Sequence, residues 1–367
     1  MTKTASEFDR AMMRRCLELA KRALGRTSPN PLVGAVVVQG ETIVGEGFHP
    51  KAGQPHAEVF ALREAGDRAK QATVYVNLEP CNHYGRTPPC SETLIEAGVS
   101  RVVVGMVDPN PKVAGGGIAR LRQAGVEVLV GVEEAACQEL NEAFVYRILH
   151  QRPLGILKYA MTLDGKIATS TGHSAWVTTP AARQLVHQVR AGCDAVIVGG
   201  NTVRRDNPQL TSHGVGHNPL RVVMSRRLEL PQEAHLWQTQ DVPTLVMTQR
   251  GANLPFQAFL RQQGVEVVEL EDLTPKAAIA HCYERGFLSV LWECGGTLAA
   301  RAIAEGAVQK VMAFIAPKII GGEAAPSPVG DLGFEQMTQA LPLERVRWRS
   351  VGTDLLVEGY LPSSEGR

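Results

Sequence analysis

The sequence carries almost no net charge, since its 38 Lys and Arg residues nearly balance its 37 Asp and Glu residues. The balance holds in each half of the chain, with 17 basic against 17 acidic residues over positions 1–150 and 21 against 20 after them. Proteins that bind long polyanions show a clustered basic excess. The charge balance therefore argues against nucleic acid as a partner, although a small phosphorylated substrate needs only a local cluster.

The sequence also lacks any apolar run that approaches the length of a membrane-spanning helix. Residues 1–20 mix charged and apolar residues at helical spacing and contain no apolar core of a signal peptide. The seven cysteines are an odd number, and only Cys81 and Cys90 belong to a motif. We expect the other five to be reduced thiols rather than a disulfide framework, as in cytosolic proteins. These absences predict a cytoplasmic protein without a membrane partner.

The chain shows no internal repeat and no low-complexity segment, and its length favours two domains. Pro153 disfavours continuation of the preceding helix and marks a boundary near residue 150. Residues 321–330, rich in Gly, Ala and Pro, are expected to form a mobile loop. The first domain is expected to have helices over 7–24, 56–65, 90–98, 116–124 and 133–149, and strands over 32–38, 43–48, 73–77, 102–105 and 126–130. The second is expected to have helices over 180–191, 274–285 and 296–305, and strands near 154–159, 194–199, 220–224, 243–248, 265–269, 288–292, 310–316, 345–350 and 354–360. Both patterns are typical of layered α/β folds.

Residues of metal-binding type occur in a specific order in the first domain. His56 lies two residues before Glu58, Cys81 follows a proline, and Cys90 comes next. One imidazole and two thiols form a ligand set for Zn²⁺, and three protein ligands leave a fourth position for water. Zinc deaminases of nucleobases carry such His-x-Glu and Pro-Cys motifs, and their glutamate transfers protons without binding the metal. The pattern predicts one zinc ion held by His56, Cys81 and Cys90, with Glu58 as the catalytic acid and base.

Two neighbouring residues are open to more than one interpretation. His83 lies between the two cysteines and could supply a fourth ligand, which would make the zinc site closed and structural. We expect His83 to contact substrate instead. Asn30, in a Pro-Asn-Pro segment, offers donor and acceptor atoms for the edge of a heterocycle, and an ordinary turn residue is the alternative.

The spacing of the cysteines departs from Pro-Cys-x-x-Cys, because eight residues separate Cys81 from Cys90. The whole string from Glu79 to Cys90, Glu-Pro-Cys-Asn-His-Tyr-Gly-Arg-Thr-Pro-Pro-Cys, resembles the deaminase half of the bifunctional riboflavin-biosynthesis deaminase/reductases. The runs Ser-Pro-Asn-Pro-Leu-Val-Gly at 28–34 and Asp-Pro-Asn-Pro at 108–111 are similar to the same family. The resemblance continues through the second half and covers nearly the whole chain.

The second half has weaker motifs of its own. Two strand patterns end in glycine pairs at 199–200 and 295–296, which let backbone amides approach a phosphate but are more often ordinary turns. Neither matches Gly-x-Gly-x-x-Gly, so no Rossmann domain is expected. The run Leu157–Lys166 looks like the opening of the family's reductase domain. The resemblance implies a cytidine-deaminase-like α/β/α layer domain over 1–150 and a dihydrofolate-reductase-like α/β domain over 151–367.

The same resemblance implies which residues of the second domain bind cofactor and substrate. The NADPH contacts would be Ala160, Trp176, Thr202, Asp206 and the turn formed by Gly295, Gly296, Thr297, Leu298, Ala299, Ala300 and Arg301. The substrate contacts would be Ser174, Arg190, Leu210 and Glu293. A guanidinium can fork onto phosphate oxygens, although a solvated helix face is the commoner place for an arginine such as Arg190. Lys158 is assigned to opening of the sugar, with a structural role in a buried strand as the alternative.

Two positions depart from the family pattern. His213 stands where the family usually has an arginine, which puts that phosphate contact in doubt. Ser225 and Arg226 stand where the strand end often reads Asp-Ser or Asp-Thr, so no cofactor contact is carried over to them.

We therefore expect a bifunctional riboflavin-biosynthesis enzyme that uses one zinc ion and NADPH. The first domain would deaminate 2,5-diamino-6-ribosylamino-4(3H)-pyrimidinone 5′-phosphate, and the second would reduce the ribosyl group to a ribityl chain. The alternatives are a zinc deaminase of tRNA or nucleosides with an unrelated second domain, and a structural-zinc interaction module. Balanced charge and the long cysteine loop oppose the first, and Glu58 with only three motif ligands opposes the second. Self-association into a homo-oligomer is left open.

Overall fold

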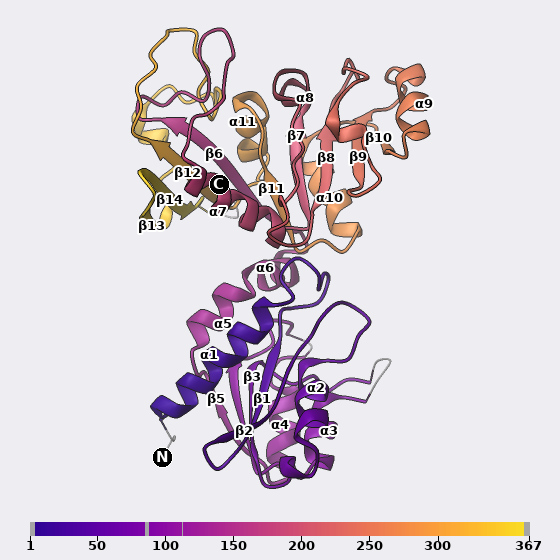
Figure 1. Ribbon diagram of the computed structural model, residues 1–367, viewed down its shortest axis with the longest axis vertical. Helices are drawn as coiled ribbons and strands as arrows, with labels where there is room; N and C mark the ends of the chain where they lie inside the picture. Colours follow the sequence, from indigo (N-terminus) through magenta and orange to yellow (C-terminus); the bar gives the residue numbers. More distant parts are fainter. Residues whose placement is uncertain (1–3, 85–87, 112, 363–367) are drawn as a thin grey trace. The chain divides into compact units, whose positions relative to one another are not determined.

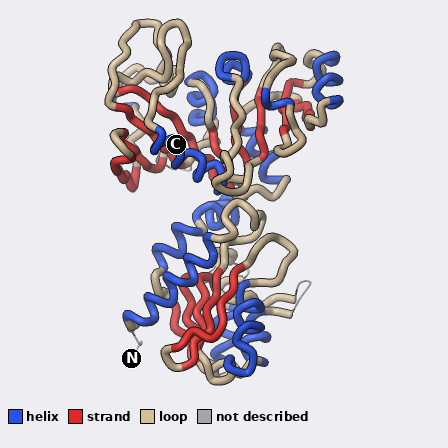
Figure 2. Tube along the Cα trace, in the orientation of Figure 1, coloured by secondary structure: helices blue, strands red, loops and turns tan. Residues whose placement is uncertain are grey.

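The computed structural model describes residues 4–84, 88–111 and 113–362, and the chain divides into two compact units, Met1–Gln151 and Arg152–Arg367. Figure 1 follows the chain through both units, and Figure 2 shows that each contains a sheet with helices beside it. The predicted boundary at residue 150 lies one residue before the observed one. Within the described ranges, no helix combines the length and the apolar character that crossing a bilayer would require.

The first unit is a five-stranded sheet between two layers of helices (Figure 1). Its strands have the order β2-β1-β3-β4-β5; β3, β4 and β5 are parallel, and β1 is antiparallel to both of its neighbours. Helices α1 and α5 pack on one face, and α2, α3 and α4 lie on the other. The strands are β1 (Gly34–Gln39), β2 (Thr42–Phe48), β3 (Thr73–Leu78), β4 (Arg101–Met106) and β5 (Glu127–Val130). The helices are α1 (Glu7–Lys21), α2 (Ala57–Ala65), the 3₁₀ turn η1 (Gly66–Ala69), α3 (Cys90–Glu96), α4 (Gly116–Gln123), α5 (Glu134–Leu140) and α6 (Glu142–His150).

Helix α2 lies directly against the backbone of β2, because two glycines leave room for it. A Cβ atom at Gly45 would lie 2.2 Å from the carbonyl oxygen of Ala61, and one at Gly47 would lie 2.4 Å from that of Ala57. Neither distance is compatible with a side chain, so α2 can approach this closely only where the strand has no Cβ. The start of α2, and with it His56, is thereby placed against the sheet.

A buried carboxylate links α1 to the centre of the same sheet. Asp9 is 3% exposed and accepts hydrogen bonds from the hydroxyl of Tyr75 on β3 (3.0 Å) and from Arg101 on β4 (2.8 Å). It also accepts from the backbone N–H of Ser6 in the capping box of α1. Burial alone would raise the pKa of Asp9, but the bonds from Arg101, Ser6 and Tyr75 outweigh it and hold the pKa well below its usual value.

The second unit is a nine-stranded sheet with the order β10-β9-β8-β7-β11-β6-β12-β14-β13. The strands from β10 to β12 run parallel, and β14 and β13 are added antiparallel at one edge. The strands are β6 (Leu154–Thr162), β7 (Ala195–Gly199), β8 (Leu220–Met224), β9 (Thr244–Gln249), β10 (Glu266–Leu270), β11 (Ser289–Trp292), β12 (Lys310–Ala316), β13 (Glu344–Val351) and β14 (Asp354–Tyr360). The helices are α7 (Pro180–Gly192), α8 (Gly200–Asp206), α9 (Leu254–Gln262), α10 (Pro275–Glu284) and α11 (Gly296–Ala304), with 3₁₀ turns η2 (His235–Trp237) and η3 (Met337–Gln339).

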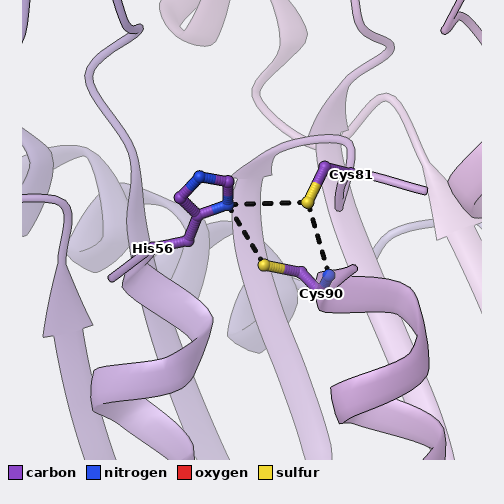
Figure 3. Close-up of side chains that lie close together, drawn as sticks. All are labelled: His56, Cys81 and Cys90. Atoms are coloured by element: carbon purple, nitrogen blue, oxygen red, sulfur yellow. Dashed lines mark hydrogen bonds between the residues drawn. The ribbon is translucent and has the colours of Figure 1, made fainter. Parts of the chain in front are cut away.

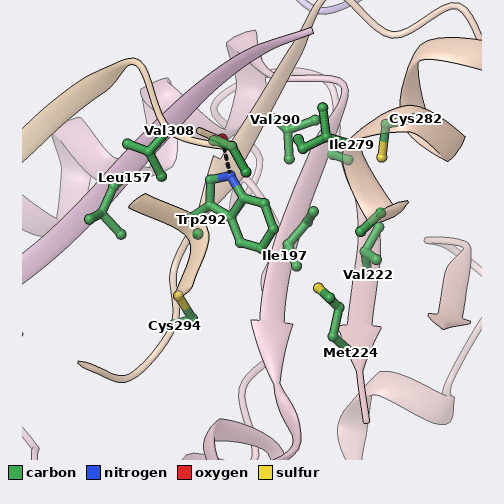
Figure 4. Packing of buried hydrophobic residues seen from close by; sticks show 14 of the residues in the cluster. Leu157, Ile197, Val222, Met224, Ile279, Cys282, Val290, Trp292, Cys294 and Val308 are labelled. Atoms are coloured by element: carbon green, nitrogen blue, oxygen red, sulfur yellow. Dashed lines mark hydrogen bonds between the residues drawn. The ribbon is translucent and has the colours of Figure 1, made fainter. Parts of the chain in front are cut away.

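The core of the second unit surrounds β11, in the middle of the sheet. Trp292 is fully buried, and its indole N–H donates to the carbonyl of Ala307 at 3.0 Å (Figure 4). The cluster to which it belongs takes residues from β6, β7, β8, β9, β11 and β12 and from the two helices α10 and α11. A separate cluster on the opposite face includes residues of α8 and α9. Because helices cover both faces, the polar groups of this unit collect where the parallel strands end at their carboxyl edge.

Three sequence-based predictions of helices were wrong. The helix expected over 133–149 is two helices, α5 and α6, which meet at Asn141. The amide of Asn141 bonds both the N–H (2.8 Å) and the C=O (3.0 Å) of Leu32, so its backbone leaves helical geometry there to serve a tertiary contact. Helices α8 and α9 were missed. Helix α8 starts at a glycine and has seven residues, and α9 begins just after the cap Asn253, with a proline in its first turn.

The segment 321–330 contains no helix or strand, and its mobility stays a prediction.

We expect Asp9→Asn to lower the free energy of unfolding of the first unit by about 1–3 kcal/mol at pH 7, because it leaves buried donors without a full acceptor. Because the pKa of Asp9 is lower in the folded than in the unfolded protein, where it is about 3.9, ionised Asp9 stabilises the fold above that pH. This stabilisation is lost as the pH falls, so the unfolding free energies of wild type and variant should converge in acid. Urea unfolding followed by circular dichroism measures the change.

All four tryptophans lie in the second unit, so their fluorescence serves as an internal control that should not change. Glu18→Gln, which removes an exposed partner of Arg15 on the same helix, should change the free energy by less than about 0.5 kcal/mol. An Asp9→Asn transition that coincides with wild type at pH 7 contradicts the prediction.

Candidate active sites

His56, Cys81 and Cys90 converge at the ends of three elements of the first unit (Figure 3). His56 caps the start of α2, Cys81 follows β3, and Cys90 is the first residue of α3. The Nδ1 atom of His56 lies 3.2 Å from Sγ of Cys90 and 3.5 Å from Sγ of Cys81. Ligands 2.0–2.3 Å from a tetrahedral zinc ion stand roughly 3.6 Å apart, so the three donor atoms fit this metal.

The electrostatics of the cluster favour the thiolate form, which zinc requires, at Cys81 and oppose it at Cys90. A hydrogen bond from Cys90 is the main cause that lowers the pKa of the Cys81 thiol to about 4, and the His56 ring acts in the same direction. The backbone N–H of Cys90 also donates to Cys81 Sγ at 3.3 Å. The bond with Cys81 and burial raise the pKa of Cys90. The pair therefore gives up one proton readily and holds the second more tightly.

Glu58 lies on the first turn of α2 with its carboxylate enclosed by protein. The residue is 3% exposed, and its Oε2 atom is buried without a hydrogen-bond partner. Burial is the largest cause that raises the pKa of Glu58. A buried carboxylate with an unpaired oxygen and a raised pKa takes up a proton more readily than an exposed carboxylate, as a group that accepts and returns protons must. His56, Cys81 and Cys90 all lie close enough to affect its pKa, and its catalytic role stays a prediction.

Asn30 is held by a histidine that sequence reasoning missed. His49 is buried, and its Nδ1 lies 3.0 Å from the carbonyl oxygen of Pro55, so Nδ1 must carry the proton. Its Nε2 then accepts from the side-chain amide of Asn30 at 3.0 Å. Burial lowers the pKa of His49, which keeps the ring neutral. The pair orients the Asn30 amide, and nothing in the sequence around His49 distinguishes it from an ordinary histidine.

His83 does not join the metal cluster. The structure places it on an exposed stretch after Cys81, and the group of donor atoms close enough to share a metal contains three side chains within the described residues. A closed structural site completed by His83 is therefore not supported. Positions 85–87 of the cysteine loop lie outside the described residues.

Asp108 is a second residue that sequence reasoning did not assign. It follows β4, next to β3, in the Asp-Pro-Asn-Pro run. Burial raises its pKa, and Cys81 and His83 are close enough to affect it. The sequence could have pointed to Asp108, because it follows a predicted strand next to the one that precedes Cys81. If these strands are parallel, both residues lie at the same edge of the sheet.

In the second unit, Lys158 on β6 and Arg190 on α7 converge on Glu293 at the end of β11. Glu293 pairs with Nζ of Lys158 at 3.2 Å and with Nε and Nη2 of Arg190 at 2.5 and 3.1 Å. Burial opposes ionisation of Glu293, but Arg190 and Lys158 outweigh it and lower its pKa to about 2. Arg190 also donates to the carbonyl of Thr211, so three of its five N–H groups are in use and two remain for a ligand.

The other predicted residues of this unit lie in different surroundings. Trp176 is 71% exposed, Arg183 lies over its ring, and Lys318 donates to its carbonyl oxygen. Ser174 donates to Asp206 at 3.0 Å, which joins one expected substrate contact to one expected cofactor contact.

The remaining predicted contacts show where a ligand could touch the chain. Ala160 is partly buried on β6, and Thr202 is partly exposed on α8. The side chain of Leu210 is buried in the core, so only its backbone can contact a ligand. The expected turn Gly295–Arg301 is instead the cap and first turns of α11, in which Ala299 and Ala300 are buried. A Cβ at Gly295 would meet no atom, whereas one at Gly296 would lie 2.7 Å from the carbonyl oxygen of Ser327, so the start of α11 is open at Gly295 and covered at Gly296.

The ring of His213 stacks on that of His187, with ring centroids 4.2 Å apart. Burial, His213 and Arg190 lower the pKa of His187, so this imidazole is neutral at physiological pH. The pair lies beside Arg190 and is a weaker source of positive charge than an arginine would be.

Comparisons with known proteins match both units. The family model described as the cytidine and deoxycytidylate deaminase zinc-binding region matches residues 6–106, and the RibD C-terminal domain matches residues 153–357. The riboflavin biosynthesis protein RibD of Synechocystis sp. is 66% identical over 354 residues, which are 96% of each chain. The solved structures of RibD from Acinetobacter baumannii and of the deaminase/reductase from Thermotoga maritima are also similar, at 39% and 37% sequence identity. Each superposition covers 97% of this chain and 99% of the other chain, with a TM-score of 0.86. The family and the two fold classes expected from the sequence are confirmed.

We expect the purified protein to hold about one zinc ion per chain, and Cys81→Ser or Cys90→Ser to remove it, because each thiolate supplies a third of the ligand set. Metal analysis after gel filtration makes the measurement. Cys282→Ser, which changes a buried cysteine of the second unit, is the matched control and should keep its zinc. Full zinc content in both motif variants would exclude the ligand assignment.

Proposed function

We propose specific substrates and residue roles for a chain that belongs to the RibD family of bifunctional riboflavin-biosynthesis deaminases and reductases. The protein is a deaminase and a reductase in one polypeptide. In our proposal the first unit deaminates 2,5-diamino-6-ribosylamino-4(3H)-pyrimidinone 5′-phosphate. The second unit then uses NADPH to reduce the ribosyl group of the product to a ribityl chain. The observation that carries the first step is the His56, Cys81 and Cys90 cluster beside the unpaired carboxylate of Glu58.

In the deaminase site, Glu58 is the group that moves protons. Zinc, when bound by the three ligands, lowers the pKa of a water molecule so that it can attack near neutral pH. Glu58 would pass a first proton from that water to the ring nitrogen. It would then pass a second proton, from the hydroxyl group that the attack leaves on the ring carbon, to the departing amine, which leaves as ammonia. Its raised pKa and unpaired Oε2 support both transfers. Asn30, oriented by His49, binds the polar edge of the pyrimidine, and exposed His83 contacts the substrate.

In the reductase site, the ion cluster on Glu293 binds and opens the sugar phosphate. NADPH, when bound, supplies the hydride for the sugar carbon that is reduced. Glu293 is ionised at neutral pH and fixes the ammonium of Lys158, which assists opening of the sugar. Arg190 contributes its two remaining N–H groups to the substrate. The sequence led us to expect that the guanidinium of Arg190 would bind two phosphate oxygens of the substrate. Because its Nε and Nη2 atoms already donate to Glu293, it can offer the substrate only the remaining N–H groups.

The remaining contacts of the reductase complete the proposal. The substrate also contacts Ser174 and the backbone of Leu210. The cofactor lies against Ala160, Trp176, Thr202, Asp206 and the open start of α11 at Gly295. The resemblance extends this contact over Gly295, Gly296, Thr297, Leu298, Ala299, Ala300 and Arg301, of which Ala299 and Ala300 have buried side chains. All seven cysteines are free, which supports the reducing cytoplasm as the compartment.

Glu58→Gln separates proton transfer from metal binding. The glutamine keeps the shape of the side chain but cannot accept a proton, so deamination should fall by at least about 10²–10⁴-fold while the zinc content stays at the wild-type value. Ammonia release and metal analysis on the same preparation measure both quantities. Near-wild-type turnover would falsify the role of Glu58.

The two chemistries should be separable by single substitutions. We would supply the deaminated intermediate directly and follow NADPH oxidation in wild type, Glu58→Gln and Arg190→Ala. Glu58→Gln should match wild type, because its defect precedes this intermediate. Arg190→Ala should still release ammonia but should reduce poorly, because it loses substrate contacts and leaves Glu293 with one cation. If wild type oxidises no NADPH with this intermediate, the proposed substrate of the second unit is wrong.

A further inference from the structure

Glu79 is a buried carboxylate that neither proposed reaction uses. It lies two residues before Cys81, is 4% exposed, and accepts four backbone hydrogen bonds. Its Oε1 accepts from Gly117 (2.9 Å) and Ile118 (3.2 Å), and its Oε2 accepts from Gly115 (2.9 Å) and Asp108 (3.2 Å). Three of these amides belong to the start of α4, where helical N–H groups have no partner within the helix. The fourth belongs to the segment that follows β4.

The same turn of α4 lies directly against the chain that carries Cys81. A Cβ at Gly117 would lie 2.0 Å from the carbonyl oxygen of Pro80, so the two backbones touch. A Cβ at Gly116 would lie 3.8 Å from the side-chain nitrogen of Asn82. Pro80 to Asn82 is thus packed along the start of α4, with Cys81 in the middle.

The opposite side of Cys81 is fixed by the start of α3. The backbone N–H of Ser91 donates to the carbonyl of Cys81 at 3.1 Å, and that of Cys90 donates to its sulfur at 3.3 Å. The hydroxyl of Ser91 also donates to Asn82 at 2.8 Å. Cys81 is therefore held between two helix starts, and Glu79 is the side chain that ties down the second of them.

We propose that Glu79 is a positioning residue of the zinc centre, which locks the start of α4 against residues 80–82 and so sets the place of the Cys81 thiolate. The inference rests on the proposed zinc site at His56, Cys81 and Cys90. Ligand groups that are held in place by hydrogen bonds bind metal more tightly than ligands that must be ordered on binding. The role depends on an acceptor-only group with two oxygens, because all four neighbours are N–H donors.

Glu79→Gln tests this dependence with the smallest change of shape. One half of the glutamine amide can still accept, but its NH₂ group must face two N–H donors. We expect the zinc dissociation constant of the full chain to rise roughly 10–100-fold, as for other groups that support metal ligands. Competition with a chromophoric chelator gives the constant, at a temperature where circular dichroism shows every zinc-free variant to be folded.

Glu92→Gln is the matched control. Glu92 on α3 forms a two-point ion pair with Arg120 on α4, at 2.6 and 2.9 Å, so the substitution weakens packing between the same two helices without touching residues 79–82. Its zinc dissociation constant should equal that of wild type. If Glu79 served only the fold, Glu79→Gln would lower the melting temperature of the zinc-free protein and leave the constant unchanged.

Gly117→Ala disturbs the same contact between α4 and residues 80–82 from the side of α4. It provides a second test if Glu79→Gln does not fold. Its methyl group would push the start of α4 away from Pro80, so the dissociation constant should rise in the same direction. A wild-type constant in the folded variants at both positions overturns the proposal. A wild-type protein that binds no zinc would instead overturn the metal site itself.

Discussion

The deaminase site depends on how closely a helix can approach a sheet edge strand. Helix α2 touches the backbone of β2 at Gly45 and Gly47, and this contact fixes both ends of its first turn. Its cap His56 then meets the cysteines at the ends of β3 and α3, while Glu58, one half-turn on, points into protein. A side chain at either glycine would move α2 outward by about 1 Å, which exceeds the roughly 0.2 Å tolerance of metal–ligand distances. Gly45 and Gly47, which have no side chains, thus determine where α2 places His56 relative to the two cysteine ligands.

Local motifs were enough to predict the metal ligands of the first unit, but they did not reach the residues around them. His56, Glu58, Cys81 and Cys90 occur in short runs whose chemistry is readable from residue type and spacing. His49 and Glu79 have no such signature, because their roles consist of contacts with Pro55, Asn30 and the start of α4. Asn141 is the clearest example in the fold itself. Periodicity predicts one helix through it, and a contact 109 residues away in the sequence divides that helix in two.

In the second unit, the sequence predicted the strands well but did not by itself identify the site residues. Its strands follow the sequence pattern closely, because buried parallel strands are continuous runs of β-branched and other apolar residues. Its site residues could be named only through family resemblance, since Lys158 and Arg190 are 135 and 103 residues from Glu293 and no local spacing relates them. They meet because β6 and β7 flank β11 and α7 packs beside β6. The short helix α8 escaped prediction for the same reason, as it depends on the end of β7 rather than on its own propensity.

Glu58 and Glu293 illustrate how one residue type serves two chemistries. Glu58 has no cation bonded to it, and burial raises its pKa, which favours the protonated form of its carboxyl group. The side chain of Glu293 is also largely enclosed, yet two cations lower its pKa to about 2, so it stays charged at any physiological pH. A carboxylate that must move a proton and one that must hold charged groups in place need opposite surroundings. The partners of each glutamate, rather than its depth in the protein, therefore decide what it can do, and they support the proton transfer proposed for Glu58 and the charge-based binding proposed for Glu293.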